Sequence, residues 1–226
     1  MAGRIAVVRV MAQYQMYMYL AYSTATDMDF QGTATCKEYA TTVDGKEIWV
    51  IDTPGLDDAP IGNLAVLNRI AEKLQAGPNV SGVIYFHRVT NPRLAGSARS
   101  NIKIFQQICG APFYYKTAFV TTMWNTIRPD QLSKFEKLNN ELRGIVSGLT
   151  DGRTKFFEFD SSKAETANEV LKHFMLVPAD RKGHELQLQL ATEVKKFGAS
   201  PGGVRRTQAG KQIVKDLNKG FNCVIL

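Results

Sequence analysis

The chain has few cysteines and no long apolar run. Both features restrict the class of protein to which it can belong. Three widely spaced cysteines in 226 residues predict no disulfide framework and suit a reducing compartment. No stretch reaches the ~18 consecutive apolar residues of a transmembrane helix. Arg9, Gln13 and Gln15 interrupt the apolar start, which argues against a cleaved signal peptide. We therefore expect a cytoplasmic protein.

Compositional extremes and internal repeats are absent as well. Eighteen glycines and eight prolines exclude a collagen-like or low-complexity chain. A content of 44% hydrophobic and 22% charged residues suits one globular domain with a sizeable core.

Positive charge is concentrated near the C-terminus. From residue 181 onward nine Lys and Arg stand against three Asp and Glu, so 9 − 3 = +6 of the net charge of +7 lies there. We predict a basic helical tail over residues 181–226, which either meets an anionic membrane surface or is a solvated face. The tail lacks interleaved aromatic residues, so nucleic acid is not an expected partner.

Strand and helix patterns alternate along the chain. Asp44-Gly45 is a two-residue hairpin signal between two strand patterns. Strands are predicted at 36–43, 46–52, 82–87, 117–124 and 155–160. Helices are predicted at 61–75, 101–109, 128–149, 165–176, 185–196 and 207–219, the last two separated by a breaker at 198–203. The alternation predicts an α/β fold with a mostly parallel sheet and one antiparallel edge strand.

The stretch DTPGL, residues 52–56, follows an apolar strand. Ligands of such sheets bind at the carboxyl ends of strands. Asp52 could hold Mg²⁺ there, and the N–H of Gly55 could approach a γ-phosphate. D-x-x-G is a short and common motif, but its context, a hairpin before it and a helix after it, favours nucleotide chemistry over a plain turn.

Three blocks, residues 36–60, 81–110 and 116–125, resemble a fungal group of G-domain GTPases. This group is related to the septins, the immunity-associated GTPases and the chloroplast-envelope import GTPases. The resemblance covers roughly residues 33–180, the expected G-domain core. It implies a G domain with helices on both faces of the sheet. It also implies binding of guanine nucleotide (GTP or GDP) with Mg²⁺, and homo- or heterodimers with related G domains.

The resemblance also assigns candidate nucleotide-binding residues. Asn125 offers only one acceptor where most G domains use an aspartate to bind guanine, so guanine itself is implied by the family alone. Implied roles are the metal- and γ-phosphate-sensing loop for Asp52, Thr53 and Gly55, the switch threonine for Thr35 or Cys36, the base-recognition strand end for Thr121, Thr122, Met123 and Trp124, and the last base-contacting loop for Asp160, Ser161 and Ser162.

The phosphate-binding loop of such a family, G-x-x-x-x-G-K-[ST], is missing from all 226 residues. When residues 5–8 are aligned with the family's first strand, Arg9 and Tyr14 occupy the two glycine positions. Glycine is used there because the backbone wraps a phosphate, often at φ > 0. Gln15, in the lysine position, supplies no positive charge, and Met16 cannot ligate Mg²⁺. Residues 1–32 are thus an altered segment in place of the first strand and phosphate loop.

Two alternatives remain open. Either the protein is a pseudo-GTPase, or the first 30 or so residues are a misjoined terminus. Leu56 stands where Ras-like enzymes place a water-orienting glutamine, and no catalytic residue is assigned. We predict a GTP-binding G-domain protein with impaired or absent hydrolysis. The alternative is a non-catalytic scaffold that dimerises with intact relatives.

The chain ends in Cys-Val-Ile-Leu, residues 223–226, which fits the C-a-a-X prenylation motif. The terminal leucine favours geranylgeranylation of Cys223. Lys211, Lys215 and Lys219 would add the electrostatic signal that a single lipid chain needs. The motif predicts association with a membrane; the alternative is an apolar terminus that packs on the domain.

Histidines give weaker signals. His87 and Arg88 end an apolar strand, where they either face the nucleotide or a dimer partner, or form a structural pair. His173 and His184 have no partner at metal-ligand spacing and are expected to be structural.

Overall fold

A six-stranded sheet forms the centre of the computed structural model, which describes residues 5–10, 35–56, 62–76, 80–90, 97–160, 162–176 and 188–221. The strand order is β2-β3-β1-β4-β5-β6, and all neighbours run parallel except β2 and β3. The strands are β1 (Ile5–Val10), β2 (Lys37–Val43), β3 (Lys46–Asp52), β4 (Val80–Arg88), β5 (Thr117–Thr122) and β6 (Lys155–Glu158). The predicted α/β fold with one antiparallel edge strand is confirmed.

The hairpin of β2 and β3 turns at the predicted dipeptide. Asp44 and Gly45 both have positive φ, 47° and 73°, which is the requirement of the tight turn that matches strand twist. Val43 therefore pairs with Lys46 directly across the turn.

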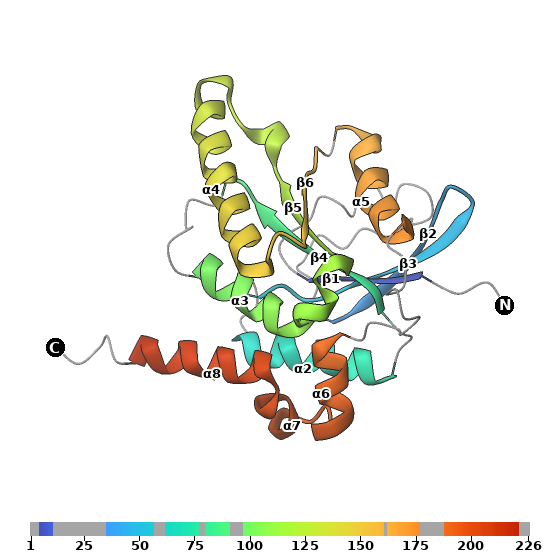
Figure 1. Cartoon of the computed structure of the whole chain (residues 1–226), viewed down its shortest axis with the longest axis vertical. Coiled ribbons are helices and arrows are strands. Elements are labelled where there is room, and N and C mark those ends of the chain that lie inside the picture. Colours follow the sequence, from blue (N-terminus) through green and yellow to red (C-terminus); the bar gives the residue numbers. More distant parts are fainter. Residues whose placement is uncertain are drawn as a thin grey trace.

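Helices cover both faces of the sheet (Figure 1). They are α2 (Gly62–Ala76), α3 (Ser97–Cys109), α4 (Leu132–Thr150), α5 (Ala164–Leu176), α6 (Gln189–Phe197), α7 (Pro201–Arg206) and α8 (Gln208–Phe221), with short 3-10 turns η1 (Ala111–Lys116), η2 (Trp124–Thr126) and η3 (Pro129–Gln131). Val83 and Tyr85 of β4 pack on the side of α2, α3 and α4, whereas Ile84 and Phe86 pack on the side of α5. Because both faces are covered, β4 is a continuous apolar run, as parallel strands usually are.

The first strand of the sheet comes from the altered N-terminal segment. β1 lies between β3 and β4 and pairs with both of them. Its central place means that residues 5–10 supply a core strand of the domain.

Helices α6, α7 and α8 form a third layer on α2 and α3 (Figure 1). Their inner side chains, Leu190, Val194, Val204, Ala209 and Ile213, join the same core cluster as α2 and α3. The basic stretch after residue 188 is therefore folded onto the domain along most of its length.

The breaker at 198–203 contains a helical start. Ser200 accepts a hydrogen bond from the N–H of Gly203 at 3.2 Å, and Pro201 occupies the first turn of α7. Serine as N-cap with proline just inside is a helix-start signal, so the predicted break between the helices ends at Ser200, three residues earlier than expected.

Close approach of α7 and α8 requires glycine, which gives a first prediction. A Cβ on Gly210 would overlap the backbone carbonyl oxygen of Val204. We expect Gly210→Ala to lower the free energy of unfolding by about 2 kcal/mol, measured by urea denaturation. Gly144→Ala in α4 is the matched control, because that Cβ meets no heavy atom within 4 Å and alanine favours the helix. Equal stability of the two variants would contradict the close packing of α8.

Candidate functional site

The carboxyl edge of the sheet gathers the predicted site residues. Parallel strands β1, β3, β4, β5 and β6 all end at this edge, and the antiparallel β2 begins there, since Lys37 pairs with Asp52. β1 lies between β3 and β4, so β2 and β3 are added to the sheet on one side of β1, and β4, β5 and β6 on the other side. Ligands of open α/β sheets bind at such a switch point.

Asp52 is the last residue of β3 and is only 2% exposed. Thr53 is also buried, and its hydroxyl donates to the carbonyl oxygen of Pro54 at 3.3 Å. Gly55, by contrast, is partly exposed. The loop thus sets a buried carboxylate at the end of the strand and opens to solvent three residues later.

β1 ends beside this loop. Arg9 pairs with Asp52 in the sheet, and β1 continues to Val10. The backbone is therefore extended at the position aligned with the first glycine of the family's phosphate loop. Tyr14, Gln15 and Met16 lie outside the described residues.

The side chain of Cys36 is turned toward α2, whereas Thr35 is exposed to solvent. The Cys36 thiol donates to the backbone oxygen of Arg69 in α2, with a sulfur–oxygen distance of 3.7 Å. Burial raises the pKa of Cys36 to about 11, against the opposing effect of Lys73, so the thiol is neutral near pH 7. Thr35 is exposed. Of the two switch candidates, Thr35 is therefore the one open to a ligand.

Leu56 is fully buried in the core cluster that includes Leu67 and Ile70 of α2. A hydrocarbon side chain cannot orient a water molecule. Leu56 therefore anchors the end of the switch loop in the core.

Thr121 and Thr122 end β5 and are almost fully buried, at 0% and 1% exposure. The Thr122 hydroxyl donates to the backbone oxygen of His87, and the Thr121 hydroxyl to that of Phe157, both at 3.4 Å. Trp124 Nε1 in turn donates to the Thr121 hydroxyl at 3.1 Å. These hydroxyls tie β5 to β4 and β6, so the atoms open to a base lie further along the loop.

The loop after β5 begins with a left-handed residue. Met123 has φ 71°, and the chain then enters η2, which contains Trp124 and the exposed Asn125. The prediction that the strand includes Trp124 was wrong, because the left-handed turn at Met123 ends the extended backbone.

Asp160 organises the loop after β6. One carboxylate oxygen accepts hydrogen bonds from the N–H and the hydroxyl of Ser162, at 2.9 and 2.6 Å, and the other lies 3.5 Å from Lys163 Nζ. The bonds from Ser162 are the main reason why the pKa of Asp160 lies below its usual value. Its carboxylate is thus engaged within the loop. Ser161 and Cys223 lie outside the described residues.

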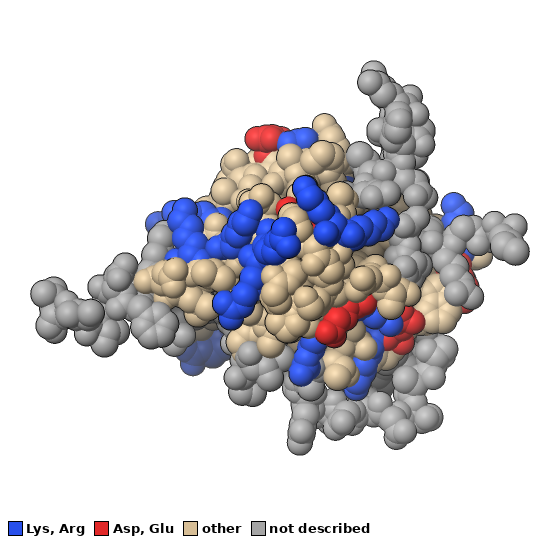
Figure 2. Space-filling view, turned by 90° about the horizontal axis from the view of Figure 1, so that it is seen from below, with Lys and Arg blue, Asp and Glu red and all other residues tan. Residues whose placement is uncertain are grey.

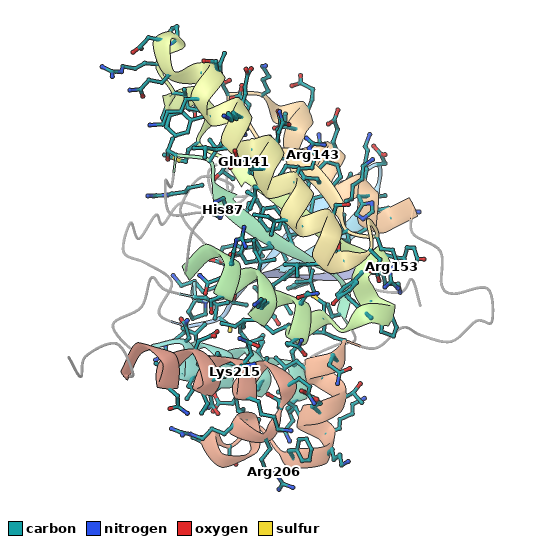
Figure 3. The ribbon with its side chains drawn as sticks, turned by 60° about the vertical axis from the view of Figure 1, so that its left-hand side comes forward. His87, Glu141, Arg143, Arg153, Arg206 and Lys215 are labelled. Atoms are coloured by element: carbon teal, nitrogen blue, oxygen red, sulfur yellow. The ribbon has the colours of Figure 1, made fainter. Side chains whose placement is uncertain are left out.

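His87 is a buried neutral side chain. Figure 3 shows it at the end of β4, between α3 and α4, and its ring centroid lies 6.0 Å from that of Phe119. Burial lowers the pKa of His87 to about 4. Packing against Phe119 supports the structural interpretation of this histidine.

No three His, Cys, Asp or Glu side chains come together as a metal site within the described residues. A nucleotide-linked Mg²⁺ needs fewer protein ligands, because it is usually held by one or two carboxylates plus phosphate oxygens. Asp52 at the strand end fits that requirement.

Comparison with known proteins identifies a family. The model of the AIG1 family matches residues 25–200, which is more than half of the chain. No curated protein sequence matches the chain.

Three solved structures share the fold. Toc33 from Arabidopsis thaliana, in complex with Mg²⁺ and GMPPNP, superposes with a TM-score of 0.55 at 17% identity, covering 90% of this chain and 86% of that one. A chain from the structural study of the chloroplast translocon components atToc33 and psToc159 gives a TM-score of 0.56 at 16% identity, covering 91% of this chain and 84% of that one. The cytosolic domain of FeoB from T. maritima, in a GDP form, gives 0.51 at 12% identity, covering 99% and 88%. At these identities the likeness shows the fold, a G domain.

The buried His87 predicts a pH dependence of stability. Above pH 6.5 the imidazole of His87 is neutral in both the folded and the unfolded state. Its protonation then takes nothing from the stability of the folded chain, which has its full value. Below pH 6.5 the unfolded chain takes up a proton that the folded chain resists until its pKa of about 4, so stability falls as the pH falls through this window, by roughly 3 kcal/mol at most. We expect His87→Phe to flatten the fall in urea midpoints between pH 7 and 4.

The readout is the difference between the two proteins at each pH. His173, whose pKa is also lowered by burial, contributes equally to both and cancels. A constant difference across this pH range would mean that His87 takes up its proton in the folded chain as readily as in the unfolded chain.

Proposed function

The chain belongs to the AIG1 family, and we propose that it is a G-domain protein that binds guanine nucleotide, with impaired or absent hydrolysis. One observation carries this proposal: the β3 end with Asp52, and Thr35 and Gly55 next to it in the chain, lie at the carboxyl edge on one side of the central β1, and the loops after β5 and β6 leave the same edge on its other side. This is the edge at which a G domain receives its ligand.

Each part of the edge would have its own role. Asp52 would hold Mg²⁺, the N–H of Gly55 would approach the γ-phosphate, and Thr35 would complete the switch side. The base would lie against the loops after β5 and β6, where Met123 to Asn125 and Asp160 to Ser162 are found. Mg²⁺, when bound, neutralises charge on the phosphates.

The phosphate side of this edge is the reason for proposing weak hydrolysis. The sequence has no G-x-x-x-x-G-K-[ST] loop, and Gln15 replaces the lysine that would contact phosphate. Leu56 is buried where a water-orienting side chain would stand. Binding would then depend on the metal, switch and base contacts.

The structural relatives support two proposals for this chain, nucleotide binding and dimer formation. Toc33 has been solved with Mg²⁺ and GMPPNP, and dimerization is important for the GTPase activity of atToc33 and psToc159. A homodimer, or a heterodimer with an intact relative, is therefore the assembly we propose to test.

The second candidate function is a pseudo-GTPase scaffold that pairs with intact relatives and binds no nucleotide. The observation that favours it is the extended backbone of β1 as far as Val10, alongside the loss of both loop glycines. A glycine loop can turn its N–H groups toward phosphate, whereas an extended strand uses them for sheet pairing.

We further propose that the protein acts in the cytoplasm at a membrane surface, through prenylation of Cys223. None of the helices in the described part of the chain has the length and apolar character of a membrane span. A single lipid chain binds weakly, so the exposed Lys211 and Lys215 of α8 would supply the second signal.

Titration with fluorescent GTP tests the nucleotide proposal. We expect saturable, Mg²⁺-dependent binding to the purified chain, with Asp52→Ala weakening it at least about tenfold because the metal loses its carboxylate. Asp130→Ala is the matched control, since Asp130 is an exposed carboxylate in η3. Fluorescent ATP, titrated in parallel, reports the selectivity for the base.

Absence of binding by a folded chain would reject nucleotide binding and support the scaffold. In that case the purified chain should form a stable complex with an intact AIG1-family G domain, detected by light scattering.

Lipidation is tested by cell fractionation in a eukaryotic host. We expect the chain to partition with membranes and Cys223→Ser to move most of it, about tenfold, into the soluble fraction. Cys36→Ala controls for the loss of a cysteine. Equal partitioning of the Cys223 variant and the parent chain would refute the lipid anchor.

A further inference from the structure

The side of α6, α7 and α8 that faces away from α2 and α3 is strongly basic. Figure 2 looks onto this side and shows Lys and Arg side chains gathered across its middle, with a smaller group of acidic side chains below and to the right of them. We call this surface the basic face and define it by the exposed Lys195, Lys196, Arg205, Arg206, Lys211 and Lys215.

The two acidic residues of these helices do not neutralise the positive charge at the surface. Glu193 is buried, and its carboxylate accepts hydrogen bonds from Gln189 Nε2 and from the N–H of Gln208, both at 2.9 Å. Asp216 is partly buried and accepts hydrogen bonds from Gln212 and from Ser100 of α3. Both carboxylates therefore serve packing between helices, and the outward charge of the basic face is positive.

The basic face is also held in a fixed shape. Its helices share the core cluster through Leu190, Val204 and Ile213, and the close approach at Gly210 locks α8 against the end of α7. Positive charges on a rigid surface need no ordering before they meet a partner, which preserves their contribution to binding.

We propose that the basic face docks on the surface of an anionic phospholipid bilayer. Charge complementarity is the first argument, because each Lys or Arg near such a surface strengthens binding about fivefold. Continuity with the predicted lipid anchor is the second, because Lys211 and Lys215 lie on α8, the last described helix before Cys223. Cys223 follows Phe221, the last residue of α8, by two residues, or at most about 7 Å of chain.

A bilayer suits the basic face better than nucleic acid does. Single-stranded nucleic acid is bound by open aromatic side chains on which bases stack. On α6–α8, the ring of Phe197 is covered by the guanidinium of Arg206, 4.6 Å from its centroid, and by Lys196 at 5.3 Å. The proposal deepens the membrane association proposed above, yet it needs neither the lipid on Cys223 nor a bound nucleotide.

Vesicle sedimentation of the unlipidated full chain tests the proposal. We expect binding to phosphatidylcholine vesicles that contain about one third phosphatidylserine, little binding to pure phosphatidylcholine, and loss of binding at high salt. Replacing Lys195, Arg205, Lys211 and Lys215 together by glutamine should reduce the partition coefficient by roughly 600-fold, about fivefold for each of the four charges. Arg206 is left in place because it stacks on Phe197.

The matched control removes the same charge elsewhere. Lys46, Lys134, Lys137 and Lys155 are exposed on β3, α4 and β6, and we expect their joint replacement by glutamine to reduce binding less than about threefold. Both variants should keep the parent chain's thermal midpoint and its response to fluorescent GTP, so a failure of nucleotide binding would leave this test intact.

Three results would overturn the proposal. The first is equal binding to neutral and anionic vesicles, and the second is an equal loss in the two quadruple variants. The third is tighter binding of a DNA or RNA oligonucleotide than of anionic vesicles, with loss in the α6–α8 variant, which would assign the basic face to nucleic acid.

Discussion

A row of aromatic rings across three strands fixes the register on which the candidate site depends. Tyr85, Phe119 and Phe156 are direct partners in β4, β5 and β6, and their rings stack at centroid distances of 4.7 and 5.4 Å. Phe105 of α3 closes one end of the row at 5.2 Å, and the guanidinium of Arg143 in α4 covers the other at 4.5 Å. A slip of one residue would turn every ring to the opposite face of the sheet. The row therefore aligns the strand ends, which lie two or three residues further on and where a ligand would bind.

Much of the fold could be predicted because its signals are local. The dipeptide Asp44-Gly45 defined a hairpin, and apolar runs alternating with helical periodicity defined a parallel sheet. What could not be predicted was the place of α6–α8 on α2 and α3, since an amphipathic pattern does not name the surface it packs on. The helical start at Ser200 was missed for another reason: the glycines that follow it mark a break as well as a close helix contact.

The same distinction, between what local sequence signals specify and what they do not, applies to the candidate site. Asp52 was placed at the carboxyl edge because one apolar strand ends there. The directions of Thr121 and Cys36 could not be predicted, because a strand buried on both faces gives no polar alternation and a thiol suits either environment. The structure thus distinguishes residues that build the edge, such as Thr121 and Leu56, from those that border solvent, such as Thr35.

The short strand β6 has a consequence for how copies of this protein can associate. It is an edge of the sheet, only four residues long, with exposed Lys155 and Glu158 at its two ends. Glu158 is held by Asn139 and Arg143 of α4, at 2.8 and 3.2 Å, so its charge stays at the strand. Short, charged edges resist the addition of a foreign strand, which is the usual first step of sheet aggregation. Two G domains of this kind would therefore have to pair through surfaces other than a sheet continued across β6.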